Sequence, residues 1–486
     1  MKTPRPAIRP ALAFLILGVL PLALLAASPG ARGSVLSEEA IDQRVLRFVD
    51  VDLLRFEDLV AAQEAGSGAP YRVAEPVPAG YSLDRDGTWE TLADGGRLWR
   101  LRVTSPGAVF LSFTLAGLSL PPGAELRFSS VDRDFVAGPY TDAIHNPYRR
   151  FGSPAVPGDS AVIEVRVPAG AAFEPSLTVE SVSHGYRDFQ GFARVPYRDG
   201  RDGPVAVTAA LGDCEVDVNC PEGSAWQADK RAVARTDDGR FLCSGSLVNN
   251  ARQDCKNYFL TANHCVSRDS TAASMVFYWN YENSSCGGGG ASTSRTSTGA
   301  ALRATSTGSD FTLLELNAAP NSAFNVYYAG FNRSATPPSS AVAIHHPTGA
   351  AKKISFENDP VADGGNFTGG WGGTHWRITG WDVGTTEGGS SGCPLFNPSH
   401  QVIGQLHGGT ADCDGGWDEF GKLASSWDLG LASWLDPDGT GAVSVGGKER
   451  STCPGGGGGC LSKGAVCKTN SQCCSHTCRK KTKTCK

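Results

Sequence analysis

Cysteine and lysine are both missing from the N-terminal part of this 486-residue chain. All fifteen cysteines follow residue 213, and no lysine occurs between Lys2 and Lys230, although arginine is frequent there. Long apolar runs are also scarce: the one present is at the N-terminus, which excludes a membrane protein with several spans. Charged residues make up 19% of the chain and the net charge is −5, which argues against a nucleic-acid binder. A hydrophobic content of 40% excludes wholesale disorder, and the length suggests roughly three folded units.

The N-terminus has the pattern of a targeting signal. Three basic residues within the first nine positions precede an apolar stretch over 11–27, which Pro21 interrupts, and small residues follow. We predict a secretory signal peptide over 1–28 rather than a membrane anchor, because the run is short and broken. The mature protein would then be secreted without a membrane span, and its cysteines would form disulfides.

The next segment, 29–210, is predicted to be a β-rich propeptide. A helical start over Glu38 to Glu64 precedes stretches that alternate apolar and polar residues, as at 100–104, 109–113 and 161–167. Turn sequences separate these stretches, which favours an antiparallel sandwich. The segment contains no recognisable catalytic or metal-ligand pattern, so we expect a passive role.

Three stretches of the following unit, 211–437, carry candidate catalytic residues. His264 ends an apolar strand pattern, Asp310 opens another, and Ser391 lies in the Gly-rich turn 388–394. Each signal alone is weak, but together and in this order they indicate a serine hydrolase. The order excludes the α/β-hydrolase arrangement, in which serine comes first within a Gly-x-Ser-x-Gly turn.

These motifs identify a family resemblance. Thr-Ala-x-His-Cys, Asp-x-x-Leu-Leu and Gly-x-Ser-Gly-x-Pro are typical of the trypsin/chymotrypsin superfamily, and further stretches resemble the bacterial lysyl endopeptidases. These stretches are 243–250, 278–281, 310–317, 344–347, 404–409 and 434–437. The likeness implies an all-β fold: a double β-barrel of the trypsin-like type, preceded by the β-rich pro-region and followed by a small disulfide knot.

The resemblance also implies roles for single residues. Ser391 would be the nucleophile, His264 the general base and then acid, and Asp310 the carboxylate that orients it. The backbone N–H groups of Gly389 and Ser391 would form the oxyanion hole. No cofactor and no metal are implied.

Substrate specificity is implied by a later loop. Position 385, where trypsins place the acid that binds the substrate side chain, is a threonine, and Asp418-Glu-Phe-Gly-Lys matches the loop that supplies this acid in lysyl endopeptidases. Asp418 would therefore bind the substrate lysine, with Glu419 or Asp414 as the alternative. The other substrate-binding residues that the family pattern implies are His407, Trp371 and Gly408.

One departure from the trypsin pattern concerns activation. Trypsin-like precursors have an aspartate before the nucleophile that pairs with the newly freed N-terminus, whereas this chain has Ser390. No carboxylate at this position can form that ion pair, so activation must work differently. His345 and His346 match no catalytic position and are interpreted as structural.

Eight cysteines of this unit allow 105 pairings. The resemblance selects Cys214–Cys413, Cys220–Cys286 and Cys243–Cys265. Elimination then pairs Cys255 with Cys393, with two free thiols as the alternative.

A Gly-rich linker, 438–459, leads to a cysteine-dense tail, 460–486, which resembles inhibitor-cystine-knot (knottin) peptides. That resemblance implies the pairs Cys460–Cys474, Cys467–Cys478 and Cys473–Cys485, and leaves Cys453 unassigned. The tail carries a charge of +7, which leaves −12 for the rest of the chain. It would attach the protein to an anionic surface or simply resist proteolysis. Lys448 in the linker is a candidate site of self-cleavage that would release the tail.

The sequence therefore predicts a secreted, monomeric serine endopeptidase that is made as a precursor and cuts polypeptides after lysine. The alternatives are an arginine-preferring or dual-specificity protease, and an inactive protease-like binding protein that carries the knottin-like tail. The absence of lysine between residues 3 and 229 bears on maturation. A strictly lysine-specific enzyme could not release itself at residue 210, so either another protease does so or the specificity is looser.

Overall fold

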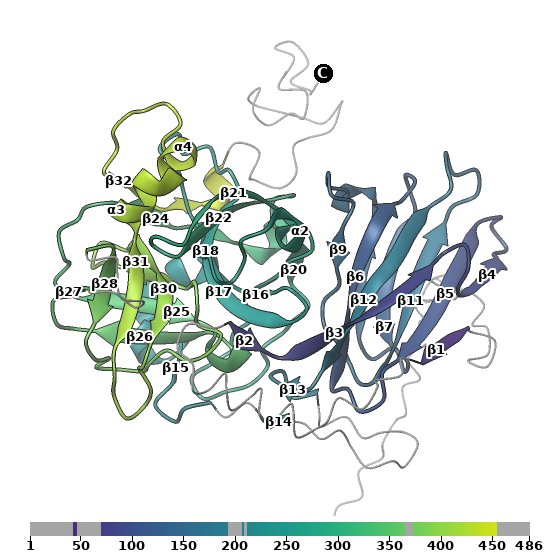
Figure 1. The fold of residues 1–486 in the computed structure, drawn as a ribbon, viewed down its shortest axis with the longest axis horizontal. Coiled ribbons are helices and arrows are strands. Elements are labelled where there is room, and N and C mark those ends of the chain that lie inside the picture. Colours follow the sequence, from purple (N-terminus) through teal and green to yellow (C-terminus); the bar gives the residue numbers. More distant parts are fainter. Residues whose placement is uncertain (1–41, 46–69, 193–206, 209–210, 365–372, 454–486) are drawn as a thin grey trace, which may run out of the picture.

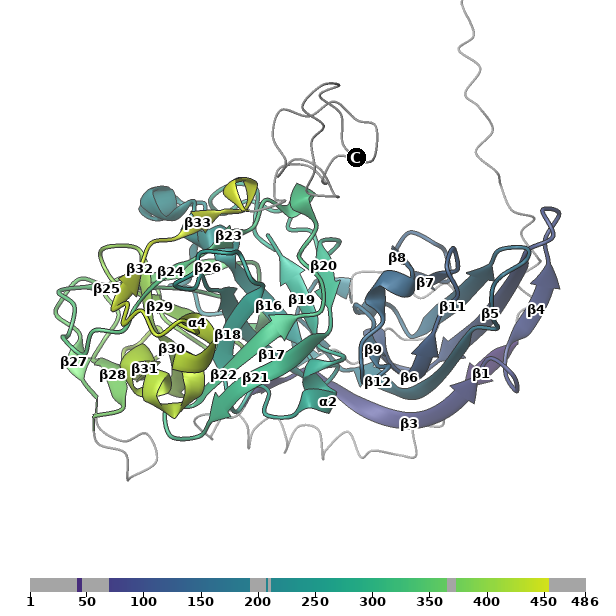
Figure 2. The same ribbon diagram turned by 90° about the horizontal axis from the view of Figure 1, so that it is seen from above.

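The computed structural model describes residues 42–45, 70–192, 207–208, 211–364 and 373–453. Within these residues the chain forms a β-sandwich and a double β-barrel, which lie side by side (Figures 1 and 2). The predicted signal peptide and the predicted knot lie outside the described residues. None of the described helices is long and apolar enough to cross a membrane.

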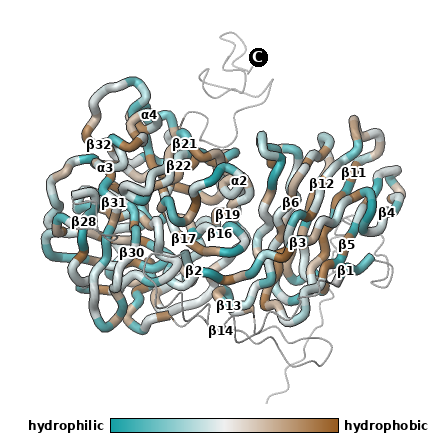
Figure 3. The backbone as a smooth tube through the Cα atoms, viewed as in Figure 1, coloured by the Kyte–Doolittle hydropathy of each residue, from teal (hydrophilic) through white to brown (hydrophobic). Residues whose placement is uncertain are grey.

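The N-terminal sandwich is built from the alternating stretches of the sequence. Hydrophobic and hydrophilic segments alternate along its strands (Figure 3), and the inward-facing side chains, among them Trp99, Phe113, Phe128 and Ile163, are fully buried. One sheet has the order β1-β5-β11-β7-β8 with β4 on β5, and the other has the order β10-β6-β12-β3 with β9 on β6. The strands are β1 (Gln43–Val45), β3 (Ala74–Ser82), β4 (Thr88–Thr91), β5 (Arg97–Thr104), β6 (Phe110–Ser119), β7 (Glu125–Ser130), β8 (Val136–Tyr140), β9 (Phe151–Gly152), β10 (Val156–Pro157), β11 (Ser160–Val167) and β12 (Ser176–Gly185).

The helix predicted over 38–64 is wrong where the structure describes it. Gln43–Val45 form β1, which pairs in parallel with the edge of β5, and the carbonyl oxygen of Asp42 accepts a hydrogen bond from Arg102 N at 3.0 Å. Unpaired backbone groups at a sheet edge bind a further strand readily, and such tertiary contacts outweigh a weak local helix propensity.

The double barrel occupies the rest of the described chain. Its first sheet has the order β20-β19-β16-β17-β18-β22-β21, and its second has the order β15-β26-β25-β29-β30-β31-β28-β27, with β24 and β32 attached. The first contains β16 (Val233–Asp237), β17 (Phe241–Leu247), β18 (Tyr258–Ala262), β19 (Val276–Trp279), β20 (Thr296–Thr298), β21 (Ala300–Ser306) and β22 (Phe311–Leu316). The second contains β15 (Val216–Asp217), β24 (Gly330–Asn332), β25 (Ala341–His345), β26 (Lys353–Glu357), β27 (Ala362–Asp363), β28 (His375–Ile378), β29 (Pro394–Phe396), β30 (Gln401–Gly409), β31 (Asp418–Lys422) and β32 (Ser444–Val445).

The described helices are all short and lie between the strands or after them. A single apolar cluster contains Leu260 and Phe311 from the first sheet and Ile344 and Phe396 from the second, so the two barrels share a core. The helices are η2 (Asp142–Ile144), η4 (Pro221–Trp226), η5 (Asp229–Ala232), α2 (Asp269–Ala272), η6 (Ser322–Phe324), η7 (Pro347–Gly349), α3 (Leu423–Ser426), η8 (Trp427–Leu431), α4 (Ala432–Leu435) and η9 (Arg450–Thr452). Two isolated strand pairs complete the fold: β13 (Arg187–Asp188) with β14 (Val207–Thr208), and β23 (Tyr327–Tyr328) with β33 (Lys448–Glu449).

The sandwich is joined to the first barrel by a strand that enters the barrel sheet. β2 (Tyr71–Arg72) pairs antiparallel with β17, with Tyr71 opposite Leu242. The Tyr71 ring packs against Gly388, where an added β-carbon would lie 2.7 Å from the ring. At Gly152 of the sandwich, an added β-carbon would collide with the carbonyl oxygen of Ser274 in the barrel, so close approach of the two units requires glycine there.

The segment predicted as a free linker, 438–459, is part of the barrel as far as residue 453. β32 pairs with β24, and β33 pairs with β23. Glu449 receives two hydrogen bonds from the guanidinium of Arg231, at 2.6 and 2.9 Å. Lys448 Nζ donates to the carbonyl oxygen of Gln253, and Cys453 forms a disulfide with Cys255. Glycine content alone predicted a free linker, whereas backbone pairing and a disulfide attach this segment to the barrel as far as residue 453.

This arrangement changes the expected fate of the tail. We expect a cut after Lys448 to be slow, because β33 pairing holds the backbone away from a protease. Any cut chain should keep residues 449–486 through the Cys255–Cys453 disulfide. Intact-mass measurement before and after reduction checks this: the fragment should separate only with reductant, whereas the Cys255→Ser variant should lose it without reductant. Release from the unreduced wild-type chain would contradict the tether.

Candidate active site

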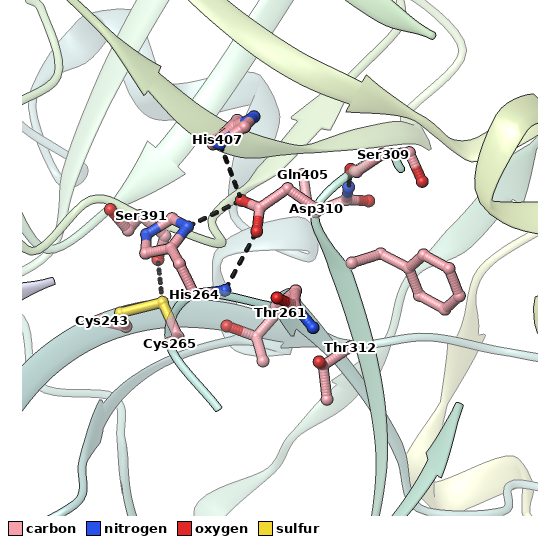
Figure 4. Close-up of polar contacts among 12 residues, drawn as sticks. Cys243, Thr261, His264, Cys265, Ser309, Asp310, Thr312, Ser391, Gln405 and His407 are labelled. Carbon is pink, nitrogen blue, oxygen red and sulfur yellow. Dashed lines mark hydrogen bonds and ion pairs between the residues drawn. A yellow bond between two sulfur atoms is a disulfide. The ribbon is translucent and has the colours of Figure 1, made fainter. Parts of the chain in front are cut away.

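The histidine and the aspartate meet because of the register between two strands. β18 and β22 pair antiparallel with Ala262 opposite Phe311, so the residues that follow β18 and those that precede β22 are neighbours. His264 Nδ1 lies 2.7 Å from Asp310 Oδ2, and His264 N donates to Asp310 Oδ1 at 3.0 Å (Figure 4). Asp310 is buried and has a left-handed backbone with φ of 52°. Two hydrogen bonds thus fix both the carboxylate and the imidazole that it orients.

Ser391 lies beside the imidazole of His264, on the side away from Asp310 (Figure 4). Its carbonyl oxygen accepts a hydrogen bond from Ser244 N on β17 at 2.8 Å. His264 Nε2 is buried and makes no hydrogen bond within the part of the chain that the structure describes. This nitrogen is therefore available to a serine hydroxyl, and such contacts often tighten only when substrate is bound.

The turn before Ser391 directs two backbone N–H groups. The N–H and C=O of a trans peptide unit point in opposite directions, so fixing the carbonyl also aims the N–H of the next residue. Thr348 N donates a hydrogen bond to the carbonyl oxygen of Gly388 at 2.6 Å, and Cys393 N donates one to the carbonyl oxygen of Ser390 at 3.0 Å. Gly389 has a φ of 97°, which favours glycine. The N–H groups of Gly389 and Ser391 consequently point away from these contacts.

Two further histidines, His407 and His375, lie next to the pair formed by His264 and Asp310. The ring of His407 stacks on that of His264, with centroids 5.9 Å apart, and its Nε2 lies 3.8 Å from Asp310 Oδ2. His407 Nδ1 contacts His375 Nε2 at 3.1 Å, and Thr374 Oγ1 holds the far nitrogen of His375 at 2.8 Å. Burial lowers the pKa of His407, and it lowers that of His375 to about 4. The neutral imidazole of His407 therefore lies beside the carboxylate of Asp310, and His375 in turn contacts His407.

The predicted substrate-binding carboxylate lies at the start of β31. Asp418 is fully buried, and its Oδ2 accepts hydrogen bonds from Trp381 Nε1 and Thr386 Oγ1, both at 2.7 Å. Burial raises the pKa of Asp418 to about 6. The opposing strand contributes Gly409, where an added β-carbon would collide with Asp418 Oδ1. The adjacent Gly408 has a φ of 149° at a bulge in the same strand pair. The absence of a side chain at Gly409 thus leaves room beside Asp418 Oδ1.

The alternative acids occupy other places. Glu419 points to the opposite face of β31, where its Oε1 accepts hydrogen bonds from Arg377 at 2.6 and 3.0 Å. Asp414 is exposed in the loop before β31. Trp371 lies outside the described residues.

Sequence reasoning missed Trp381, Thr386 and His375. Trp381 and Thr386 approach Asp418 from a different segment of the barrel, which no local pattern indicates. His375 lies four residues after Trp371, which the family pattern implied, so the same part of the sequence contained it.

The disulfides correct one prediction. Cys214–Cys413, Cys220–Cys286 and Cys243–Cys265 are present as expected. Cys255 does not pair with Cys393, because Cys393 is a free thiol buried in the core of the second barrel. Cys255 instead borders the first barrel's core, which also contains its partner Cys453. The three pairs predicted for 460–486 lie outside the described residues.

Two groups of side chains have spacings that could hold a metal ion. Cys243, His264 and Cys265 form one, but the disulfide uses both sulfur atoms. His264, Asp310 and His407 form the other, and there the His264–Asp310 hydrogen bond already joins two of the three ligand atoms. The arrangement is thus better suited to proton transfer than to metal binding.

Comparison with known proteins agrees with this geometry. Residues 208–421 match the family model of the lysyl endopeptidase C-terminal domain, and residues 53–186 match that of the N-terminal domain. The lysyl endopeptidase of Pseudomonas aeruginosa is 30% identical over 356 residues, which cover 67% of this chain and 71% of that protein.

More distant likenesses occur among solved structures. The match to an HtrA-type protease with a bound tripeptide covers 51% of this chain and 68% of the protease chain, at 16% identity and a TM-score of 0.32. The match to a Glu endopeptidase covers 41% of this chain and 88% of the endopeptidase chain, at 15% identity and a TM-score of 0.29. The assignment is carried by the two family models and the Pseudomonas relative: this chain belongs to the lysyl endopeptidase family and is a serine endopeptidase.

Proposed function

We propose that the protein hydrolyses polypeptides on the carboxyl side of lysine, with Ser391 as nucleophile, His264 as general base and then acid, and Asp310 as the orienting carboxylate. The observation that carries the lysine specificity is the environment of Asp418. Its Oδ2 already has two donors, and its Oδ1 lies against Gly409, which has no side chain.

The chemistry follows from the hydrogen bonds of the triad. Asp310 holds the Nδ1 proton of His264, which leaves Nε2 free to remove the proton from the Ser391 hydroxyl. The serine oxygen then attacks the substrate carbonyl carbon, and the N–H groups of Gly389 and Ser391 would stabilise the negative oxygen. His264 returns the proton to the leaving amine, and water repeats the sequence to release the acid.

Hydrogen-bond capacity at Asp418 favours lysine over arginine. A guanidinium usually binds a carboxylate through both oxygens in a planar fork, whereas an ammonium is a point charge that needs one. Trp381 and Thr386 saturate Oδ2, and within the described residues no donor reaches Oδ1. A single available oxygen suits an ammonium, so a dual or arginine preference is the less favourable alternative.

We further propose that the chain is exported by its signal peptide and that the sandwich is removed on maturation. The absence of lysine between residues 3 and 229 means that the proposed specificity cannot release the barrel. Another protease would therefore process the precursor, and the Ser391→Ala precursor should still be processed in the native host.

Loss of the nucleophile should abolish turnover. Ser391→Ala should lower kcat on the order of a million-fold, because no other group can form the acyl intermediate. A serine-directed phosphonate should label the wild-type enzyme at Ser391 and leave the variant unlabelled. Absence of labelling in the wild type would favour the alternative of an inactive protease-like binding protein.

Removal of the Asp418 carboxylate should strongly lower activity, and it should do so selectively for lysyl substrates. Taking away one partner of a buried ion pair costs roughly 3–5 kcal/mol, so Asp418→Asn should lower kcat/KM for lysyl substrates roughly 150- to 5,000-fold. Digestion of an unstructured protein, followed by sequencing of the new ends, should show wild-type cuts after lysine. If the variant keeps that preference, another residue binds the lysine.

Binding of lysine should depend on pH through Asp418. Because burial raises the folded-state pKa of Asp418 from 3.8 to about 6, its charge destabilises the fold fully above about pH 6, and this penalty declines below pH 6 until it is gone near pH 3.8. Ammonium binding needs the charged form, so affinity should be full above about pH 6 and fall about tenfold per pH unit below it. Calorimetry on Ser391→Ala with a lysine-ending peptide checks this. A norleucine-ending peptide is the control and should show no such step.

A further inference from the structure

A chain of buried hydrogen bonds lies directly beneath the turn that carries Ser391. His345 Nδ1 is 2.8 Å from Ser390 Oγ, and His345 Nε2 is 3.0 Å from Ser355 Oγ. All three side chains are completely inaccessible to solvent. A buried polar group without a hydrogen-bond partner destabilises the fold, so these contacts contribute to holding the turn.

The main chain at both ends fixes where the protons are. Glu387 N donates to Ser390 Oγ at 3.1 Å, so the serine hydroxyl donates in turn to His345 Nδ1. Ser355 Oγ donates to the carbonyl oxygen of Thr385 at 2.6 Å, so it accepts from the Nε2–H of His345. Burial lowers the pKa of His345 to about 3, in agreement with a neutral imidazole protonated at Nε2.

This network starts and ends on the same short segment. It runs from the N–H of Glu387 through three side chains back to the carbonyl of Thr385. Thr386, between them, is the residue that donates to Asp418. Ser390, whose side chain is held, precedes the nucleophile and carries the carbonyl that aims the Ser391 N–H. The network therefore fixes the oxyanion turn, whereas Thr386 is held by its own hydrogen bond to Asp418.

We propose that His345 is a positioning residue that holds the nucleophile turn in its working form, and that the turn therefore needs no free amino terminus. In trypsin-like precursors, the aspartate at the position of Ser390 forms its ion pair only after chain cleavage has produced a new N-terminal ammonium group. Here a neutral serine takes that place, and its hydrogen bonds are satisfied from within the barrel in the uncleaved chain. The inference rests on the proposed role of Ser391 as nucleophile.

The first test removes the amino terminus as a charged group. Selective transamination of the α-amino group with pyridoxal phosphate converts it to a carbonyl in the mature enzyme, with trypsin as a control that should lose activity. We expect kcat/KM of the lysyl endopeptidase to stay within about threefold of the untreated value. A loss of 100-fold or more would overturn the inference. Absence of turnover before treatment would instead refute the proposed function.

The second test separates positioning from mere packing. In Ser390→Ala and His345→Leu, the affinity for a peptide aldehyde ending in lysine should fall about 10²-fold, because this ligand needs the oxyanion hole. The affinity for a simple alkylammonium, which uses only the lysine pocket, should change less than about threefold. His346→Leu is the matched control: it removes an equally buried imidazole whose ring bonds only the carbonyl oxygen of Ala350, and it should keep the wild-type ratio of the two affinities. An unchanged ratio in Ser390→Ala would refute the positioning role.

Discussion

The antiparallel pairing of β18 with β22 is the constraint on which the site depends. With Ala262 opposite Phe311, the ends of two strands place His264 and Asp310 in contact although 45 residues separate them in sequence. A slip of one residue would send every side chain of the strand to the other face. Both faces of the two strands are buried and their apolar side chains divide between two separate clusters, so a slip would exchange residues between differently packed cores. The core thus maintains the geometry of the polar site.

The acidic groups around the cleft differ in how their charge is compensated. Asp310 receives two hydrogen bonds from His264, and Glu419 is paired with Arg377. Asp418 has only two neutral donors, so desolvation raises its pKa. A buried carboxylate without a cation is costly, and a cationic side chain that enters the pocket relieves that cost. Under the proposed function, relief of this cost would contribute to the binding of a lysine side chain.

Much of the site could be predicted because its residues lie in short local motifs. His264, Asp310, Ser391 and Asp418 each belong to a recognisable stretch, and the structure brings the first three together and places Asp418 on the adjoining strand pair. The sandwich also followed from simple alternation.

Contacts that join distant segments could not be predicted in this way. Trp381 and Thr386 reach Asp418 across the barrel. The Cys255–Cys393 assignment failed because elimination assumed that Cys453 belonged with the tail, whereas the chain doubles back over 198 residues to form its disulfide. Pairing cysteines by elimination is valid only if the domain boundary that it assumes is correct. The boundary here was drawn from glycine content, which says nothing about where backbone hydrogen bonds form.

The pairing of β2 with β17 has a consequence for the uncleaved chain. Because β2 belongs to the same chain as the edge with which it pairs, this contact is intramolecular and acts at an effective concentration, which for short flexible linkers is on the order of millimolar. An incoming polypeptide that needs the same edge, beside Gly388, must compete with that local concentration rather than with the amount of precursor in solution. Once the connection is cut, the same contacts operate at the bulk concentration of the separated sandwich, and dilution alone lowers their occupancy. If the sandwich is removed as proposed, dilution would thus lower the occupancy of this edge by β2.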